Sequence, residues 1–458
     1  MGKWVTQVLG SVLLVGLVSG CLLKPTSKAN ASSRGSVNGT NPPVLLDSDL
    51  ILPGEAIPVF SSQEVVRGAV GISGASWDFG YYGLSGDGEH LVFTTEEALT
   101  VEPSVQGTGR TYKKNIRTGG LTLVSRDVDG NSREVVNGLA NLSRNGRYAV
   151  FTGYAAFNLP EVVGYSGNLT WRRDMETGEL KHVSTDGETS PYPYPELSQV
   201  SDDGRFVVYR RAGLIYRRDM TQSMAEVVSR SPDQSQILNS EMMGSGMVSM
   251  SGDGQKVIFM VPNAADFVPG ASGNNQVIFV DLVTQQRKVV SASASGQPAQ
   301  GGFHGGGLFK AKLSSDGSKV FFEGYASNLI PGLGSASAPH IYRKDVSTGE
   351  VLLVSSDSSG DPLTSGGSLG GVSDDGRFAC LSTQEDSTQP GVSGPFRVKV
   401  KDLAAGKLVD IEYGSNGENL NSGTHRSLCS ISGDGRFAVI TVRESDGRIR
   451  TVYRQIRK

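Results

Sequence analysis

The sequence predicts an all-β protein, a seven-bladed β-propeller with four antiparallel strands in each blade. A short turn phrase, Ser-x-Asp-Gly or Ser-x-Asn-Gly followed by an apolar run, occurs seven times. The glycines of successive copies stand 58, 58, 50, 63, 59 and 59 residues apart, and a near-constant period of this size is typical of repeat architectures. A second phrase follows each turn phrase, so that every repeat carries the signals of four strands.

The turn phrase predicts a tight hairpin between the first and second strands of each blade. Glycine supplies a positive φ, and the preceding Asp or Asn hydrogen-bonds nearby backbone. An Asp-Gly pair flanked by apolar residues is a strong hairpin signal. The run after each turn, such as 257–259, is apolar at nearly every position, which indicates a strand buried on both faces. The seven copies begin at Ser85, Ser143, Ser201, Ser251, Ser314, Ser373 and Ser432.

The second phrase predicts the third and fourth strands. It reads Ile-Tyr-Arg-Arg-Asp at 215–219 and Ile-Tyr-Arg-Lys-Asp at 341–345, and a short turn and a strand ending in Val-Ser follow. The two basic residues of a pair point to opposite faces of a strand. We expect them to form interblade ion pairs and solvated charges, with anion binding as the alternative.

The two ends of the repeat region predict how the ring closes. The seventh repeat stops at its third strand, 451–454, and the segment Ser62–Gly68 resembles an unpaired fourth strand placed before the first repeat. Pairing the two would close the ring and remove an exposed sheet edge.

These repeats resemble the TolB-type, WD-like propeller repeats of bacterial envelope proteins, over residues 56 to 458. The proline that is usual in that family's turn phrase is absent from all seven copies. The resemblance implies a propeller in the cell envelope. It implies no particular activity, because propellers host many unrelated functions.

The N-terminal segment predicts export and lipid attachment. Residues 1–20 carry Lys3 and then an apolar stretch, 8–18, that is too short to span a bilayer. The stretch ends in Val-Ser-Gly before Cys21, which resembles a bacterial lipobox, so we expect Cys21 to carry the lipid. The alternative is an ordinary secretory signal with a chance cysteine.

The remaining chain divides into a flexible tether and the propeller. Residues 21–54 are rich in Ser, Asn, Gly and Pro without apolar periodicity, and 55–458 hold the blades. Leu22 stands where a retention Asp would keep a Gram-negative lipoprotein in the inner membrane. The resemblance therefore favours the outer membrane.

Composition narrows the function classes. The chain has 458 residues, 60 glycines, 19% charged residues and a net charge of −3, so it lacks the basic footprint of a nucleic-acid-binding protein. Its three cysteines do not make a disulfide scaffold. We expect Cys380 and Cys429 to be buried free thiols.

One end of the propeller is expected to carry the binding surface. Connections between the second and third strands and between blades are long, and in an up-and-down blade both classes emerge at the same end. Aromatic residues gather on these loops and are typical of binding hot spots. The alternative is that they fill the channel mouth or pack on neighbouring blades. The candidate binding residues are Trp77, Tyr81, Tyr192, Tyr194, Phe303 and His304.

Catalytic, metal and cofactor sites are not predicted. The five histidines show no metal-ligand spacing. Gly366–Gly370 matches Gly-x-Ser-x-Gly, but it lies in an interblade loop rather than a strand-turn-helix, so we interpret it as chance.

The leading hypothesis is a monomeric, lipid-anchored, non-catalytic module that binds an envelope protein or polymer and touches the membrane through its lipid alone. The alternatives are a propeller hydrolase or lyase acting on envelope glycan or peptide, and a structural spacer.

Overall fold

The structure is a computed structural model, and all its described residues belong to one compact unit, Leu45–Lys458. The predicted signal segment, residues 1–20, and the tether, 21–54, lie outside the described residues. The described residues are 57–58, 83–95, 98–100, 109–133, 135–154, 159, 168–184, 198–211, 213–236, 238, 248–300, 310–334, 338–385, 394–412, 428–443 and 449–457.

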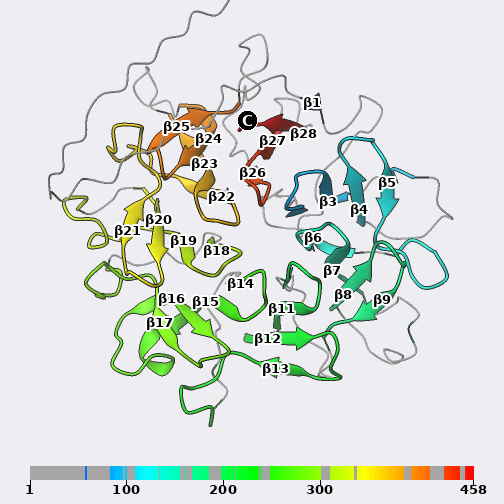
Figure 1. Cartoon of the computed structure of the whole chain (residues 1–458), viewed down its shortest axis with the longest axis horizontal. Coiled ribbons are helices and arrows are strands. Elements are labelled where there is room, and N and C mark those ends of the chain that lie inside the picture. Colours follow the sequence, from blue (N-terminus) through cyan, green and yellow to red (C-terminus); the bar gives the residue numbers. More distant parts are fainter. Residues whose placement is uncertain are drawn as a thin grey trace, which may run out of the picture. The chain divides into compact units, whose positions relative to one another are not determined.

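Seven four-stranded antiparallel sheets follow one another around a central axis (Figure 1), which confirms the predicted all-β propeller. The strands of each blade are given from the axis outward. Blade one consists of β2 (Gly83–Leu84), β3 (His90–Thr95), β4 (Arg110–Asn115) and β5 (Leu121–Leu123), and blade two of β6 (Val135–Leu142), β7 (Tyr148–Tyr154), β8 (Asn168–Asp174) and β9 (Leu180–His182). Blade three consists of β10 (Ser198–Val200), β11 (Phe206–Arg211), β12 (Leu214–Asp219) and β13 (Ala225–Val227).

The last four blades follow the same order. Blade four consists of β14 (Val248–Met250), β15 (Lys256–Asn263), β16 (Asn274–Asp281) and β17 (Arg287–Val289), and blade five of β18 (Ala311–Leu313), β19 (Lys319–Gly324), β20 (His340–Asp345) and β21 (Val351–Leu353). Blade six consists of β22 (Ser368–Val372), β23 (Phe378–Gln384), β24 (Phe396–Asp402) and β25 (Lys407–Asp410), and blade seven of β26 (Leu428–Ile431), β27 (Phe437–Arg443), β28 (Ile449–Gln455) and β1 (Ile57–Pro58). A short 3₁₀ helix, η2 (Ala264–Asp266), follows β15.

The turn phrase forms the predicted hairpin in every blade. In blade three, Ser201 Oγ donates a hydrogen bond to Asp203 Oδ1 at 2.6 Å and accepts one from the Phe206 N–H at 2.9 Å. Gly204 has a φ of 77°, which an L-residue adopts only with strain. The same pair of serine bonds occurs in all seven turns, so the phrase is a self-contained hydrogen-bonded unit.

The Val-Ser ending of the fourth strand also has a structural role. Ser229 Oγ accepts a hydrogen bond from the buried Ile215 N–H on β12 at 3.1 Å. This bond satisfies a backbone donor at the point where the short outer strand ends. The serines that do the same in other blades are Ser125, Ser184, Ser291 and Ser355.

The basic pairs on the third strands point to opposite faces as predicted, but their partners differ from the prediction. Arg172 donates to the Gly204 carbonyl of blade three, whereas Arg173 Nε donates to the Val124 carbonyl of blade one at 2.7 Å. Lys344 Nζ likewise donates to the Ser293 carbonyl of blade four at 2.7 Å. These cations thus bind backbone carbonyls of neighbouring blades, because buried carbonyls there need donors.

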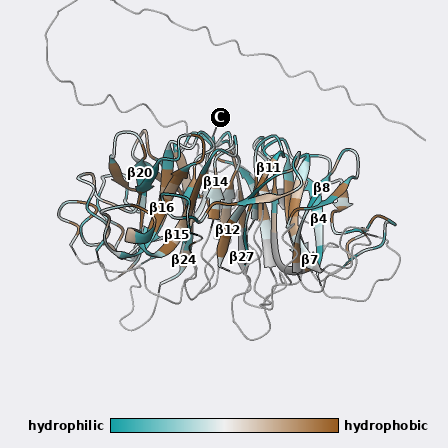
Figure 2. Ribbon diagram, turned by 90° about the horizontal axis from the view of Figure 1, so that it is seen from below, coloured by the Kyte–Doolittle hydropathy of each residue, from teal (hydrophilic) through white to brown (hydrophobic). Residues whose placement is uncertain are grey.

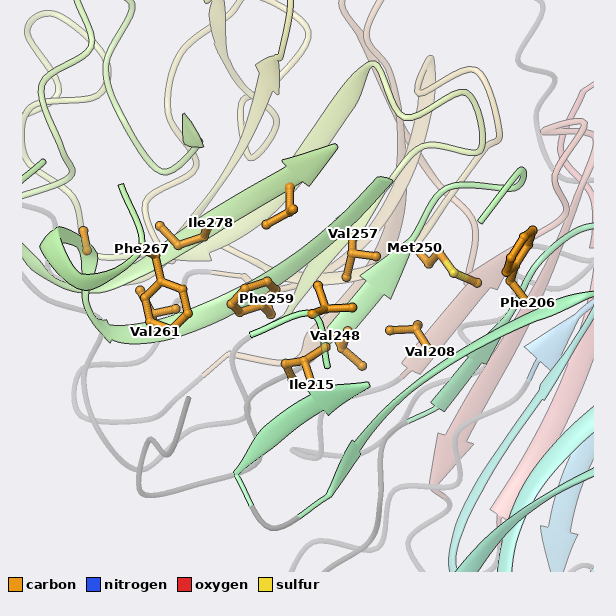
Figure 3. Packing of buried hydrophobic residues seen from close by; sticks show 13 residues of the cluster. Phe206, Val208, Ile215, Val248, Met250, Val257, Phe259, Val261, Phe267 and Ile278 are labelled. Atoms are coloured by element: carbon orange, nitrogen blue, oxygen red, sulfur yellow. The ribbon is translucent and has the colours of Figure 1, made fainter. Parts of the chain in front are cut away.

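Apolar side chains between successive sheets form the core. Between blades three and four, Val208 and Ile215 pack against Val248, Val257 and Phe259 (Figure 3). Burying one such side chain contributes about 1.5–3 kcal/mol, so each blade is stabilised chiefly by its neighbours.

The first and last blades are in contact, and this contact closes the ring. At the axis, the Asp434 N–H of blade seven donates to the Gly86 carbonyl of blade one at 3.0 Å, and β26 contacts β2. At the outer edge, Ile57 and Pro58 pair with Tyr453 and Val452 of β28. The predicted closing strand, Ser62–Gly68, lies outside the described residues, so closure by that segment stays a prediction.

The two propeller cysteines form a disulfide between blades six and seven, so the prediction of free thiols was wrong. Cys380 on β23 and Cys429 on β26 are 49 residues apart, with Cα atoms at 6.2 Å. A Cβ on Gly370 would lie 2.4 Å from Cys429 Sγ and 2.7 Å from Cys380 Sγ. The glycine therefore leaves the space that the disulfide fills.

Candidate functional site

The two ends of the propeller differ. Figure 2 shows the sheets from the side, with the strands running between the ends of the ring. All seven turn phrases lie at one end, which we call the turn end. The long connections from β3 to β4 and from β19 to β20 leave at the opposite end, the loop end, while β11 and β12 are joined almost directly.

The predicted site residues fall on the loop-end connections and at the N-terminus. Cys21 and the candidate binding residues lie outside the described residues, so their roles stay predictions. These candidates are Trp77, Tyr81, Tyr192, Tyr194, Phe303 and His304.

The described residues present a polar site at the axis. The inner strands contact one another around the ring, and the residue after the serine of each turn faces its counterpart in the next blade. Ser315 N–H donates to the Asp374 carbonyl at 3.0 Å, and Asp374 N–H donates to the Gly433 carbonyl at 2.8 Å. Among the described residues, backbone hydrogen bonds join the turns of six of the seven pairs of neighbouring blades, all but blades two and three, so they form an almost complete circle that narrows the channel at the turn end.

Four side chains fill the middle of this circle. Arg144 Nη2 of blade two lies 2.9 Å from Asp374 Oδ2 of blade six, and Arg144 Nη1 lies 3.9 Å from Asp202 Oδ2. Ser315 Oγ donates to the same Asp202 oxygen at 2.8 Å. Because blades two and six are not neighbours, this axial network spans the ring and obstructs the channel at the turn end.

Glycines make room for the axial network. A Cβ on Gly433 would lie 2.0 Å from Asp374 Oδ2, and one on Gly252 would lie 2.2 Å from Asp202 Oδ2. The corresponding position in blade one is Gly86, where a Cβ would meet Arg144 Cγ at 2.3 Å. Small residues in blades one, four and seven thus accommodate the charged side chains of blades two, three and six.

Asp374 is the titratable centre of the axial network. The pKa of its carboxyl is raised from 3.8 to about 6, chiefly by burial and also by the nearby Asp202 carboxylate, although the Arg144 guanidinium opposes the shift. Since a pKa near 6 allows both protonation states around neutrality, this carboxyl has the property of a general acid or of a pH-sensitive contact.

A second ring of side chains lies one level deeper, two residues before each turn serine. Asn141 Nδ2 donates to the Ser198 carbonyl. Ser249 Oγ donates to Gln199 Oε1 at 3.0 Å and accepts the Leu313 N–H at 3.1 Å. All seven positions of this inner ring are described, and Lys312 is the single charged residue among them. The inner ring is Gly83, Asn141, Gln199, Ser249, Lys312, Gly371 and Ser430.

A shallow pocket of about 790 Å³ lies between blades two and three at the turn end. The Tyr148 ring stands between the Arg147 and Arg172 guanidinium groups, whose carbons lie 5.1 and 4.6 Å from its centroid. Arg147 is already paired with Asp174 at 2.6 Å and holds the pKa of that carboxyl well below its usual range. The pocket is therefore a weaker candidate than the axis.

Metal ligands are not gathered within the described part of the chain, where no three His, Cys, Asp or Glu side chains lie close enough to hold an ion. His182 and His340 bond to the serines at the ends of outer strands, at 3.0 and 2.9 Å. No helix among the described residues is both long and apolar enough to cross a membrane.

No protein-family model matches the sequence, and no curated protein sequence matches it significantly. Among solved structures, TolB from Acinetobacter baumannii is 15% identical, with 84% of this chain and 86% of that chain covered and a TM-score of 0.38. A putative TolB from Agrobacterium tumefaciens is 14% identical, over 75% and 96%, with a TM-score of 0.38. An oligogalacturonate lyase in complex with manganese is 13% identical, over 89% and 99%, with a TM-score of 0.49.

The solved structures that are similar to this chain thus include two TolB proteins, the family that its repeats resemble. The chain is a seven-bladed β-propeller with a polar, obstructed axis. At such identities the likeness carries no information about activity.

Proposed function

We propose that this protein is a lipid-anchored propeller of the cell envelope that binds a protein or polymer at its loop end without transforming it. The observation that carries the proposal is the difference between the two ends. At the turn end, serine, aspartate and backbone groups are bonded within and between the turns. The loop end carries the long connections, where binding residues of rigid scaffolds commonly lie.

The Cys380–Cys429 disulfide supports an envelope location. Disulfides persist in oxidising compartments such as the bacterial periplasm and the cell surface, and are rare in reducing cytosol. Together with the expected lipid attachment at Cys21, the disulfide supports a position outside the cytoplasm.

Capture of the partner from envelope extracts tests the loop-end surface. We expect Trp77→Ala and Tyr194→Ala to weaken capture by more than ~2 kcal/mol in binding free energy while melting changes little, because hot-spot aromatics act on the partner. The control is Lys181→Met at the turn end, which should capture normally. A large loss of melting temperature with normal capture by the folded fraction would count against the surface, because aromatic residues that pack on blades behave that way.

A second candidate function rests on Asp374. A carboxyl with a pKa near 6, facing a guanidinium on the axis, is a feature of general acids, so a hydrolase or lyase acting on envelope glycan or peptide is the alternative. Asp374→Asn separates the two functions, because it would abolish turnover of such a substrate but leave capture at the loop end unchanged.

A further inference from the structure

Lys312 stands out among the inner-ring residues because its ammonium group lacks a partner. None of the described residues forms a hydrogen bond or ion pair with its side chain, whereas Asn141, Gln199 and Ser249 at equivalent positions are all bonded. Burial, and to a lesser extent the charge of Lys310, lowers the pKa of Lys312 to about 8. A buried ammonium without a counter-charge is costly, so its presence calls for a compensating role.

The side chain of Lys312 is half-buried and keeps partial access to solvent. Asn141, Gln199 and Ser430 of the same ring are also half-buried. Its neighbours on β18, Ala311 and Leu313, pack into the core against blade four, so Lys312 points to the other face of the strand. The matching position in blade six is Gly371, which contributes no side chain at this level.

Lys310 adds a second positive charge on the same side of the chain. It lies two residues before Lys312, and residues two apart share a face of a strand at about 7 Å spacing. Its backbone carbonyl accepts the Glu323 N–H at 3.2 Å, and its Nζ donates to Ser368 Oγ of blade six at 3.1 Å. The two lysines therefore form a basic column that runs from the inner ring toward the loop end.

Access to this column is one-sided. At the turn end, Arg144 and Asp374 span the ring 2.9 Å apart, beyond the inner ring. Among the described residues, no carboxylate forms an ion pair with Lys312, so Asp202 and Asp374 do not neutralise it. A ligand that reaches Lys312 must therefore arrive from the loop end.

We propose that Lys312 and Lys310 form an axial anion-binding site that takes a phosphate or carboxylate group presented from the loop end. The ligand supplies the counter-charge that the protein withholds from Lys312. Asn141 and Gln199 hold the equivalent positions of the inner ring, at the level of Lys312, and add polar side chains to the lining of the site. The proposal stands independently of the envelope partner, since it rests on the described axis and not on the loop-end aromatics.

Inorganic phosphate and acetate are the probes for this site, titrated into the purified chain at constant ionic strength and followed by calorimetry. We expect saturable binding of at least one anion with a dissociation constant of about 1 mM or below, weakened at least ~10-fold in Lys312→Met. The matched control is Lys181→Met, which removes the same charge from an exposed lysine that pairs with Glu179 at 3.1 Å. Binding that is equal in the two variants, or absent from the wild type at ~10 mM of both anions, would overturn the proposal.

Two further measurements separate binding from a structural role. The ε-carbon NMR signal of Lys312, assigned by its loss in Lys312→Met, should titrate near pH 8 and move to higher pH when phosphate or acetate binds. The variant should also melt at a higher temperature than the wild type at pH 7 without anion, because it removes an unpaired buried charge. A lower melting temperature would mark Lys312 as a structural residue and contradict the site. Lys310→Gln provides a second binding test if Lys312→Met fails to fold.

Discussion

The serine that begins each turn phrase makes the same two hydrogen bonds in all seven blades. Ser201 Oγ accepts the buried Phe206 N–H and donates to Asp203, so one hydroxyl satisfies the backbone and fixes the side chain of the turn. Sequence spacing predicted these turns because the bonds are local. The inner ring was missed because its seven positions share no chemistry, ranging from glycine to lysine. Counting two residues back from each turn serine would have found it.

The turn serine is the first residue to test. Ser201→Ala leaves the buried Phe206 N–H without an acceptor, so we expect the free energy of unfolding to fall by about 1–3 kcal/mol. Denaturant unfolding measures the loss. Ser235→Ala is the matched control, because Ser235 bonds to Asp233 at an exposed turn and should cost under ~0.5 kcal/mol. Equal losses in the two variants would contradict a special role for the turn serines.

Asp374 gives a pH-dependent prediction. Its pKa is raised from 3.8 in the unfolded chain to about 6 in the fold, so the folded chain binds the extra proton between about pH 4 and 6. Its contribution to stability therefore falls as pH rises through this window and stays low above it. Asp374→Asn removes the charge. We expect the variant to be about 1–2 kcal/mol more stable than the wild type at pH 7 and similar at pH 4, allowing for the partly exposed partner Arg144.

Unfolding of the wild type and the variant across pH 4 to 8 measures this difference. Asp375→Asn is the control, since Asp375 accepts bonds from Ser373 Oγ and the Arg377 N–H and its loss should weaken the turn at every pH. A constant offset between wild type and Asp374→Asn over the whole range would show that Asp374 titrates normally.

At the scale of elements, β22 shows what sequence patterns leave out. The register of β22 against β23 shifts between Leu369 and Val372, a stretch that contains Gly370, the last glycine of the nucleophile motif. Gly370 faces the disulfide and Gly366, with a φ of 59°, lies against the Pro339 carbonyl, so both glycines serve packing. Pattern matching placed this motif in an interblade loop, whereas Ser368, Leu369 and Gly370 lie in the strand β22. It could not predict the disulfide, because two cysteines 49 residues apart meet only when adjacent blades are stacked.

Gly370→Ala tests the packing at this element. Its Cβ would meet both sulfur atoms of the disulfide, so we expect a loss of about 1–3 kcal/mol, as for other overpacked cores. Gly120→Ala is the control, because the nearest atom to its Cβ is the exposed Thr118 Oγ1 at 3.3 Å. Thermal unfolding and a thiol assay under denaturing conditions report the result. A fully oxidised Gly370→Ala protein with unchanged stability would contradict the close packing around the disulfide.

The whole molecule joins its blades by several kinds of contact. Apolar side chains fill the space between sheets, cations donate to the carbonyls of adjacent blades, and an almost complete circle of backbone hydrogen bonds connects the turns around the axis. The seven-bladed ring could be predicted because the turn phrases recur in the sequence at a near-constant spacing. The axial network could not, because Arg144, Asp202 and Asp374 are far apart in sequence and meet only once the ring has closed.

A deletion series tests ring closure at the outer edge. β28 lacks a fourth strand from its own repeat, and Ile57 and Pro58 pair with it. Removing residues 1–54 should leave stability unchanged, because this part precedes the pairing. Removing 1–70 should cost several kcal/mol, out of a typical total of roughly 5–15, because the edge of β28 is then exposed.

A deletion of 1–60 decides which segment closes the ring. If Ile57 and Pro58 suffice, the loss appears at this step and the longer deletion adds little. If Ser62–Gly68 provides the closing strand, the deletion of 1–60 keeps most of the stability and the loss appears only when 1–70 is removed. Melting curves of the three truncated proteins, measured with the Cys380–Cys429 disulfide intact, distinguish these outcomes. Three identical curves would mean that the contacts of β26 with β2 and the Asp434–Gly86 bond hold the ring closed without an N-terminal strand.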